Sequence, residues 1–134
     1  MKKILCLFIT AILTVSLCGC SYVNYEKQNF SQKVTIVKMP SPPKCKTTDS
    51  TTVVNDVIAV LSDIEKTSVE EGKINGGWNI MVKLNIDKKE LVYTIGSVFT
   101  DSDGRQYKVS NYEEIEDKLT KIYNELDVVE VDYP

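Results

Sequence analysis

The segment 78–86 alternates apolar and polar side chains and is the clearest strand signal in this chain. Its apolar set is Trp78, Ile80, Val82, Leu84 and Ile86, and its intervening set is Asn79, Met81, Lys83 and Asn85. Successive side chains of a strand point to opposite faces of a sheet, so the pattern predicts one buried face and one largely wet face. Such a strand is typical of an antiparallel sheet that is covered on one side only.

Other strands are predicted around this one, at residues 33–39, 91–95, 98–99 and 105–109. They are β-branched or alternating segments bounded by turn residues. The turns are expected at 40–43, 75–77, 87–89 and 101–104, which are rich in Pro, Gly, Asn and Asp. Gly96 is expected at a bulge or bend.

Two amphipathic helices are predicted from apolar residues that recur every three or four positions. The first is expected to begin at Asp49, as the cap residue, and to bury Val54, Val57, Ile58, Leu61 and Ile64. The second is expected to open with a capping box formed by Ser110 and Glu113, or by Asn111 and Glu114 one residue later. Its apolar stripe consists of Ile115, Leu119, Ile122 and Leu126.

The order of these elements predicts an α+β domain over residues 33–134. We expect an antiparallel sheet of about four to five strands, with both helices packed on one face. The last residues, 127–134, are left as either a short edge strand or a loose tail.

The N-terminus carries a different pattern. Lys2 and Lys3 precede an almost wholly apolar run, 4–17, and no further charge occurs before Glu26. A positive start followed by a short apolar segment is typical of a secretory signal peptide. The 16 residues from Ile4 to Gly19 fall short of the about 20 that span a bilayer as a helix.

The end of this run, Leu17-Cys18-Gly19-Cys20, resembles the lipobox of bacterial lipoproteins. That pattern has an aliphatic residue, a small residue, Gly or Ala, and then Cys; Cys18 stands where Ala or Ser is more usual. The resemblance implies that a diacylglyceryl group is attached to the Cys20 thiol and that cleavage follows Gly19. Residues 1–19 would be the signal peptide, and 20–32 would be the lipidated N-terminus and tether.

The expected location is therefore the extracytoplasmic side of the cell membrane, reached through the acyl chains on Cys20. Two chains hold a protein on a bilayer firmly, whereas one binds reversibly. Removal of residues 1–19 leaves 115 of the 134 residues and changes the net charge from −3 to −5. Nucleic acid is an unsuitable partner for so acidic a chain.

The composition argues against a catalytic or metal-binding role. The chain contains no His, the commonest general base and a frequent zinc ligand. The run Asp101-Ser102-Asp103-Gly104 resembles half of a calcium loop, but Phe99 and Ser110 stand at two ligand positions, so a hairpin turn is favoured. Cys45 would be the one free thiol of the processed chain. We therefore expect no enzyme, no cofactor and no metal.

The leading functional hypothesis is a non-catalytic interaction module, of which an immunity or inhibitor lipoprotein is one version. Its partner would be an envelope protein or ligand that the sequence does not identify. The alternative is a carrier or sensor with a small pocket between sheet and helices. Trp78 is expected in the core; if exposed, it would form a candidate binding surface with Tyr107 or Tyr112.

Overall fold

The computed structural model describes residues 32–39, 41–69 and 77–134. The predicted signal peptide, 1–19, and the predicted lipidation site Cys20 lie outside these ranges. So does the predicted tether, 20–32, except for Gln32, which the structure places in β1. Within them the chain forms the following elements: β1 (Gln32–Lys38), β2 (Lys44–Thr48), α2 (Thr51–Ser62), β3 (Lys66–Val69), β4 (Ile80–Ile86), β5 (Lys89–Ile95), β6 (Val98–Thr100), β7 (Gln106–Val109), α3 (Tyr112–Glu125) and β8 (Val131–Asp132).

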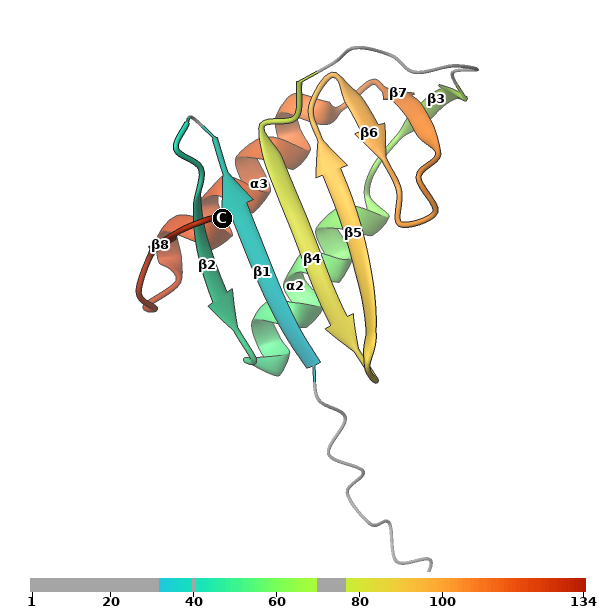
Figure 1. The fold of residues 1–134 in the computed structure, drawn as a ribbon. Coiled ribbons are helices and arrows are strands. Elements are labelled where there is room, and N and C mark those ends of the chain that lie inside the picture. Colours follow the sequence, from blue (N-terminus) through green and yellow to red (C-terminus); the bar gives the residue numbers. More distant parts are fainter. Residues whose placement is uncertain (1–31, 40, 70–76) are drawn as a thin grey trace, which may run out of the picture.

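The strands form one sheet in the order β3-β7-β6-β5-β4-β1-β2-β8, and every pair is antiparallel. Both helices cross the same face of this sheet (Figure 1). We call that the inner face and the opposite one the outer face. The α+β class, the antiparallel sheet and the helices on one face are as expected.

The predicted strand count of four to five is wrong, because the described sheet has eight strands. The additional strands are β2, β3 and β8, which lie at or next to the two edges. They are short and largely polar, so they lack the apolar alternation that marks a central strand. Their pairing depends on backbone hydrogen bonds to a neighbour, and side-chain patterns do not encode those bonds.

The core lies between the inner face and the helices, and its residues form one cluster. The alternation predicted over 78–86 is confirmed for Ile80, Val82 and Leu84, which are at most 2% exposed, but the strand itself begins only at Ile80. The helices contribute Val54 and Val57 from α2, and Ile115, Leu119 and Tyr123 from α3. Ile58, which was expected in the core, is 36% exposed. It lies at the edge of the apolar arc of α2.

Neither predicted helix cap is formed. α2 begins at Thr51, after Ser50, and no side chain caps it. α3 begins at Tyr112, and the hydroxyl of Ser110 donates instead to Glu65 Oε2 (2.8 Å). Both caps were predicted from local sequence spacing alone. In the structure the hydroxyl of Ser110 is instead engaged in a tertiary hydrogen bond, to Glu65.

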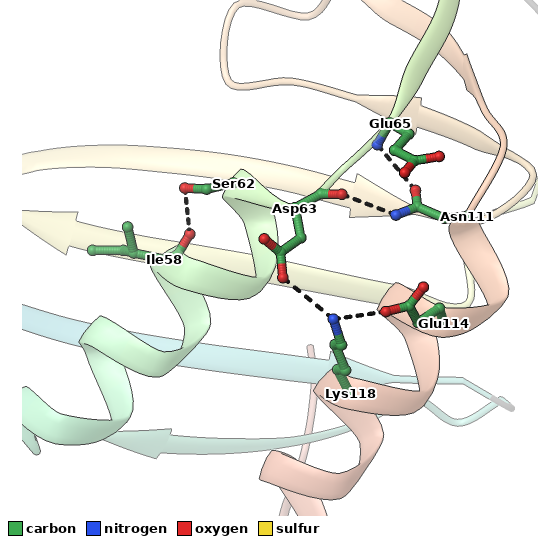
Figure 2. Close-up of polar contacts among 7 residues, drawn as sticks. All are labelled: Ile58, Ser62, Asp63, Glu65, Asn111, Glu114 and Lys118. Carbon is green, nitrogen blue, oxygen red and sulfur yellow. Dashed lines mark hydrogen bonds and ion pairs between the residues drawn. The ribbon is translucent and has the colours of Figure 1, made fainter.

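Further hydrogen bonds and ion pairs join the end of α2 to the start of α3 (Figure 2). The side chain of Asn111 donates to the carbonyl of Asp63 and accepts from the amide of Glu65. Lys118 lies between two carboxylates, 2.8 Å from Glu114 and 3.2 Å from Asp63. The hydrogen bond to Glu114, and to a smaller extent the one to Asp63, raise the pKa of Lys118. The two helices are therefore tied at one end by polar groups.

The connections from β4 to β5 and from β5 to β6 both restrict which residues can occupy them. The β4–β5 turn has two residues, Asp87 and Lys88, with φ of 52° and 67°. Gly96 lies between β5 and β6, as the predicted bend requires. A Cβ at Gly96 would come within 2.7 Å of the carbonyl oxygen of Gly77. No other residue fits there without a shift of the backbone.

The C-terminal residues cross the outer face near β1 and β2 (Figure 1). The backbone amide of Tyr133 donates to the carbonyl of Pro43, and its hydroxyl lies 3.8 Å from the sulfur of Met81. The ammonium of Lys83 lies 4.9 Å from the centre of the Tyr133 ring. Val37 and Cys45, which pair with each other on this face, are buried. Of the two readings left open for 127–134, the short strand β8 is the one observed.

Candidate functional site

A groove opens on the inner face between α2 and strands β4, β5 and β6. Its volume is about 310 Å³. It is lined by Ile58, Leu61, Ser62, Lys66, Leu84, Ile86, Leu91, Tyr93, Phe99 and Asp101. Seven of these ten side chains are apolar or aromatic, so the groove is an apolar channel with a few polar groups at its border.

The groove follows from the dimensions of the fold. Eight strands spaced about 4.8 Å apart make a sheet roughly 34 Å wide. Two helices, each about 10 Å across, cover only about 20 Å of that width. Leu91 and Tyr93 of β5 consequently remain half-buried on the inner face. Ile58 and Leu61 form the wall opposite them.

An aromatic row crosses the sheet at the groove. The rings of Tyr93 and Phe99 are stacked with centroids 6.1 Å apart, and Phe99 and Tyr107 are 6.3 Å apart. They come from the neighbouring strands β5, β6 and β7. The ammonium of Lys66, on β3, lies 4.4 Å from the Tyr107 centroid and 5.6 Å from that of Phe99. Attraction to the ring faces holds this cation beside the groove.

The polar residues Asp101, Ser62 and Lys66 at the groove differ in whether they already have bonding partners within the protein. One oxygen of Asp101 accepts from the amides of Asp103 (3.0 Å) and Arg105 (2.9 Å), and the other from the Tyr107 hydroxyl (3.3 Å). The hydroxyl of Ser62 donates to the Ile58 carbonyl (2.8 Å; Figure 2). Lys66 forms no ion pair with any residue that the structure describes. It is therefore the polar group best placed to meet a ligand.

The predicted surface residues are distributed as follows. The expectation that Trp78 lies in the core is wrong: it precedes β4, is half-buried and is not a member of the core, because the sheet pairing of this segment begins only at Ile80. Tyr107 belongs to the aromatic row. Tyr112 opens α3 and its hydroxyl bonds to Glu113 (3.2 Å), a contact that raises the pKa of Tyr112. Within the described ranges no ring contact joins any two of these three residues.

Lys44 and Lys46, both on β2, form polar contacts with other parts of the domain. Lys44 pairs with Asp132, which raises the pKa of Lys44 and fastens β8 to β2. Lys46 donates to the carbonyls of Tyr123 (3.1 Å) and Leu126 (2.9 Å) at the end of α3. A cation at that position is favourable because the carbonyl end of a helix carries partial negative charge.

Cys45, which lies between these lysines in sequence, is 6% exposed. Burial raises the pKa of its thiol, and this effect outweighs the opposing influence of Lys83. In the described part of the chain, His, Cys, Asp and Glu do not gather in groups of three that could hold a metal ion. Among the same residues no helix has the length and apolarity to cross a membrane.

The sequence-based alternative of a small pocket between sheet and helices named none of the residues that line this groove, although one signal for them was present. Leu91 and Tyr93 alternate with the same period as Ile95, which indicates the inner face. Lys66 carried no signal, because its segment was expected to be a polar connection rather than a strand. Scans against protein-family models, curated proteins and solved structures find no match to this chain.

Proposed function

We propose that this chain is a lipid-anchored binding protein of the extracytoplasmic membrane surface, which holds a small apolar ligand in the groove beside α2. The observation that carries the proposal is the groove itself, about 310 Å³ in volume and lined mainly by apolar side chains. Small-molecule sites have volumes of roughly 300–1,000 Å³ and a mostly apolar lining. The groove lies at the lower end of that range, which suits a ligand with one apolar group.

The proposal assigns no reaction to the protein. The sequence has no His to act as a general base. Asp101, the carboxylate at the groove, accepts three hydrogen bonds within its own hairpin. Both of its oxygens are therefore already engaged by donors of the protein itself. Binding without chemistry is the simplest use of this arrangement.

Anchoring is tested by metabolic labelling of cells that express the full chain with a clickable fatty acid. The wild type should incorporate the label, and Cys20→Ala should not. Cys45→Ala is the matched control, because it removes a buried thiol that is not proposed to carry lipid. Equal labelling of wild type and Cys20→Ala, or no labelling of either, would refute the anchor.

Ligand binding is tested on the purified full chain with a photoreactive derivative of 1-decanol, a neutral apolar probe. Mass spectrometry of the labelled peptides should place the probe on α2 and β5. Ile58→Glu should lose that labelling, because it puts a charge into the apolar wall. Val129→Glu is the control, since Val129 is 81% exposed and does not line the groove. Labelling that Ile58→Glu leaves unchanged would exclude the groove as the site.

A second candidate function is the protein-binding module of the sequence hypothesis, with the outer face of the sheet as its surface. Both helices lie on the inner face, so among the described residues only the C-terminal segment crosses the outer face (Figure 1). Thr94 lies there, opposite Met81. Cross-linking in intact cells should capture a partner with wild type and lose it with Thr94→Arg. Capture equally strong with both variants would reject the outer face.

A further inference from the structure

We infer that the ligand of the groove is a single-chain amphiphile with an anionic head, a medium-chain carboxylate whose head lies at Lys66. The inference rests on the proposed binding function and specifies the ligand class. The apolar part is assigned by the groove lining, and the head by the ammonium of Lys66, which forms no ion pair with any residue that the structure describes.

The lining requires a ligand whose buried part is a hydrocarbon. Ile58 and Leu61 on α2 face Leu84 and Ile86 on β4 and Leu91 on β5 across the groove. A sugar or another polar ligand would need hydrogen-bonding partners along this wall, since burying a polar group without one is costly. The hydroxyl of Ser62 and the carboxylate of Asp101 are already bonded within the protein. An alkyl chain needs no such partners.

The head is assigned from charge complementarity. Lys66 places its ammonium over Phe99 and Tyr107 at the border of the groove. It forms no ion pair with any described residue, whereas Asp101 is occupied by donors of its own hairpin. An anionic head placed at Lys66 therefore gains a cation partner, whereas a cationic head at the same position would meet a like charge.

The volume decides between one chain and a larger occupant. About 310 Å³ is at the bottom of the range for small-ligand sites. A two-chain phospholipid would leave most of its hydrocarbon outside the groove. A free carboxylate with one chain of moderate length buries most of its apolar surface there.

The experiment uses the purified full chain and a decanoate that carries a diazirine in its alkyl chain. After irradiation, labelled residues are mapped by mass spectrometry, and unlabelled compounds compete for the site below their micelle concentrations. We expect the label on α2 and β5. We expect decanoate to compete best, 1-decanol less well and decyltrimethylammonium least.

Chain length provides an independent readout. From hexanoate upwards, competition should strengthen by about fourfold for each added methylene that enters the groove. Beyond the length that fills the groove the gain should stop. A gain that continues unchanged to dodecanoate and beyond would overturn the assignment to a groove of this size.

Variants separate the head from the chain. Lys66→Gln should weaken competition by decanoate about threefold to fivefold, as for an exposed ion pair, and leave 1-decanol unaffected. Lys121→Gln is the matched control, because Lys121 is an exposed lysine of α3 away from the groove. Ile58→Glu should reduce competition by all ligands. Circular dichroism confirms that each variant is folded.

The remaining outcomes are distinguishable from one another. If all three head groups compete equally and Lys66→Gln changes nothing, the carboxylate assignment fails while the proposed groove function stands. If the groove peptides are not labelled by decanoate or by the neutral probe, both fail. Stronger competition by vesicles of anionic phospholipid than by decanoate would overturn the single-chain assignment.

Discussion

The side-chain amide of Asn111 donates from Nδ2 to the carbonyl oxygen of Asp63 over 2.9 Å (Figure 2). Through Oδ1 the same side chain accepts from the amide of Glu65 at 3.0 Å. One residue at the start of α3 thus pairs two backbone groups at the end of α2. Few side chains carry both a donor and an acceptor in this form.

Asn111→Ala should lower the free energy of unfolding by about 1–2 kcal/mol, because two hydrogen bonds to the backbone are lost. Asn111→Asp should also destabilise, since a carboxylate cannot donate to the Asp63 carbonyl. Urea denaturation measures both effects. Asn124→Ala is the control: Asn124 is exposed on α3, and alanine there favours the helix slightly. Equal effects at 111 and 124 would show that Asn111 does not join the helices.

Lys88→Gly should stabilise the fold by about 0.5–1 kcal/mol. Lys88 has a φ of 67° in the two-residue β4–β5 turn, a conformation that is unfavourable for residues with a Cβ and accessible to Gly. Thermal unfolding should show the midpoint rising. Lys89→Gly, one residue later in β5, should be destabilising because glycine weakens a strand. A fall in stability with Lys88→Gly would contradict the assigned turn.

Tyr123 should make the protein sensitive to alkaline pH. Burial, and then the hydrogen bond to Glu130 (2.7 Å), raise the pKa of its hydroxyl well above the usual range. The unfolded state therefore loses this proton first. The contribution is complete below about pH 10 and is lost above it, at up to about 1.4 kcal/mol per pH unit.

The measurement is the free energy of unfolding between pH 8 and pH 12 for wild type and Tyr123→Phe. The variant should be less stable at pH 8, having lost the bond to Glu130, and its stability should fall less steeply above pH 10. Tyr93→Phe is the control, since it removes a half-buried hydroxyl elsewhere on the inner face. Parallel curves for wild type and Tyr123→Phe would count against this prediction.

Cys45 should react slowly with thiol reagents in the folded protein. Its burial on the outer face limits access, and the raised pKa of the thiol reduces the thiolate that reacts. Tyr133→Ala should accelerate the reaction, because Tyr133 contacts Met81, the neighbour of the Val37–Cys45 pair. Labelling of the Cys45 peptide is followed by mass spectrometry, with Tyr93→Ala as the control on the inner face. Equal rates for the wild type and Tyr133→Ala would show that the C-terminal segment does not protect the thiol.

Central strands and the inward faces of the helices were predictable from sequence. The alternation over 80–86 and the stripe that includes Ile115 and Leu119 each depend on one period within one element, and both are confirmed. The caps at Asp49 and Ser110 failed for the opposite reason. A cap residue has several backbone and side-chain partners within reach, and the tertiary neighbour Glu65 took Ser110.

The groove, like the helix caps, depends on tertiary packing that a local sequence pattern does not encode. Ile58 and Val57 are adjacent in sequence and similar in hydropathy, yet Val57 is fully buried and Ile58 lines an open surface. The difference depends on where α2 lies across the sheet. That position is set by the packing of both helices on eight strands, and no local pattern contains it.

The positions of charged residues, apolar runs and residues with helix or strand periodicity were sufficient to predict the α+β class and a sheet covered on one side. They also predicted most of the residues that face the core. These properties follow from each side chain's own solvation and from its direction along a helix or strand. The edge strands, the tie at Asn111, the cover provided by Tyr133 and the groove with Lys66 were decided by the tertiary structure. Each depends on which groups remain unpaired or uncovered after distant segments have packed, so it is a property of their relative placement.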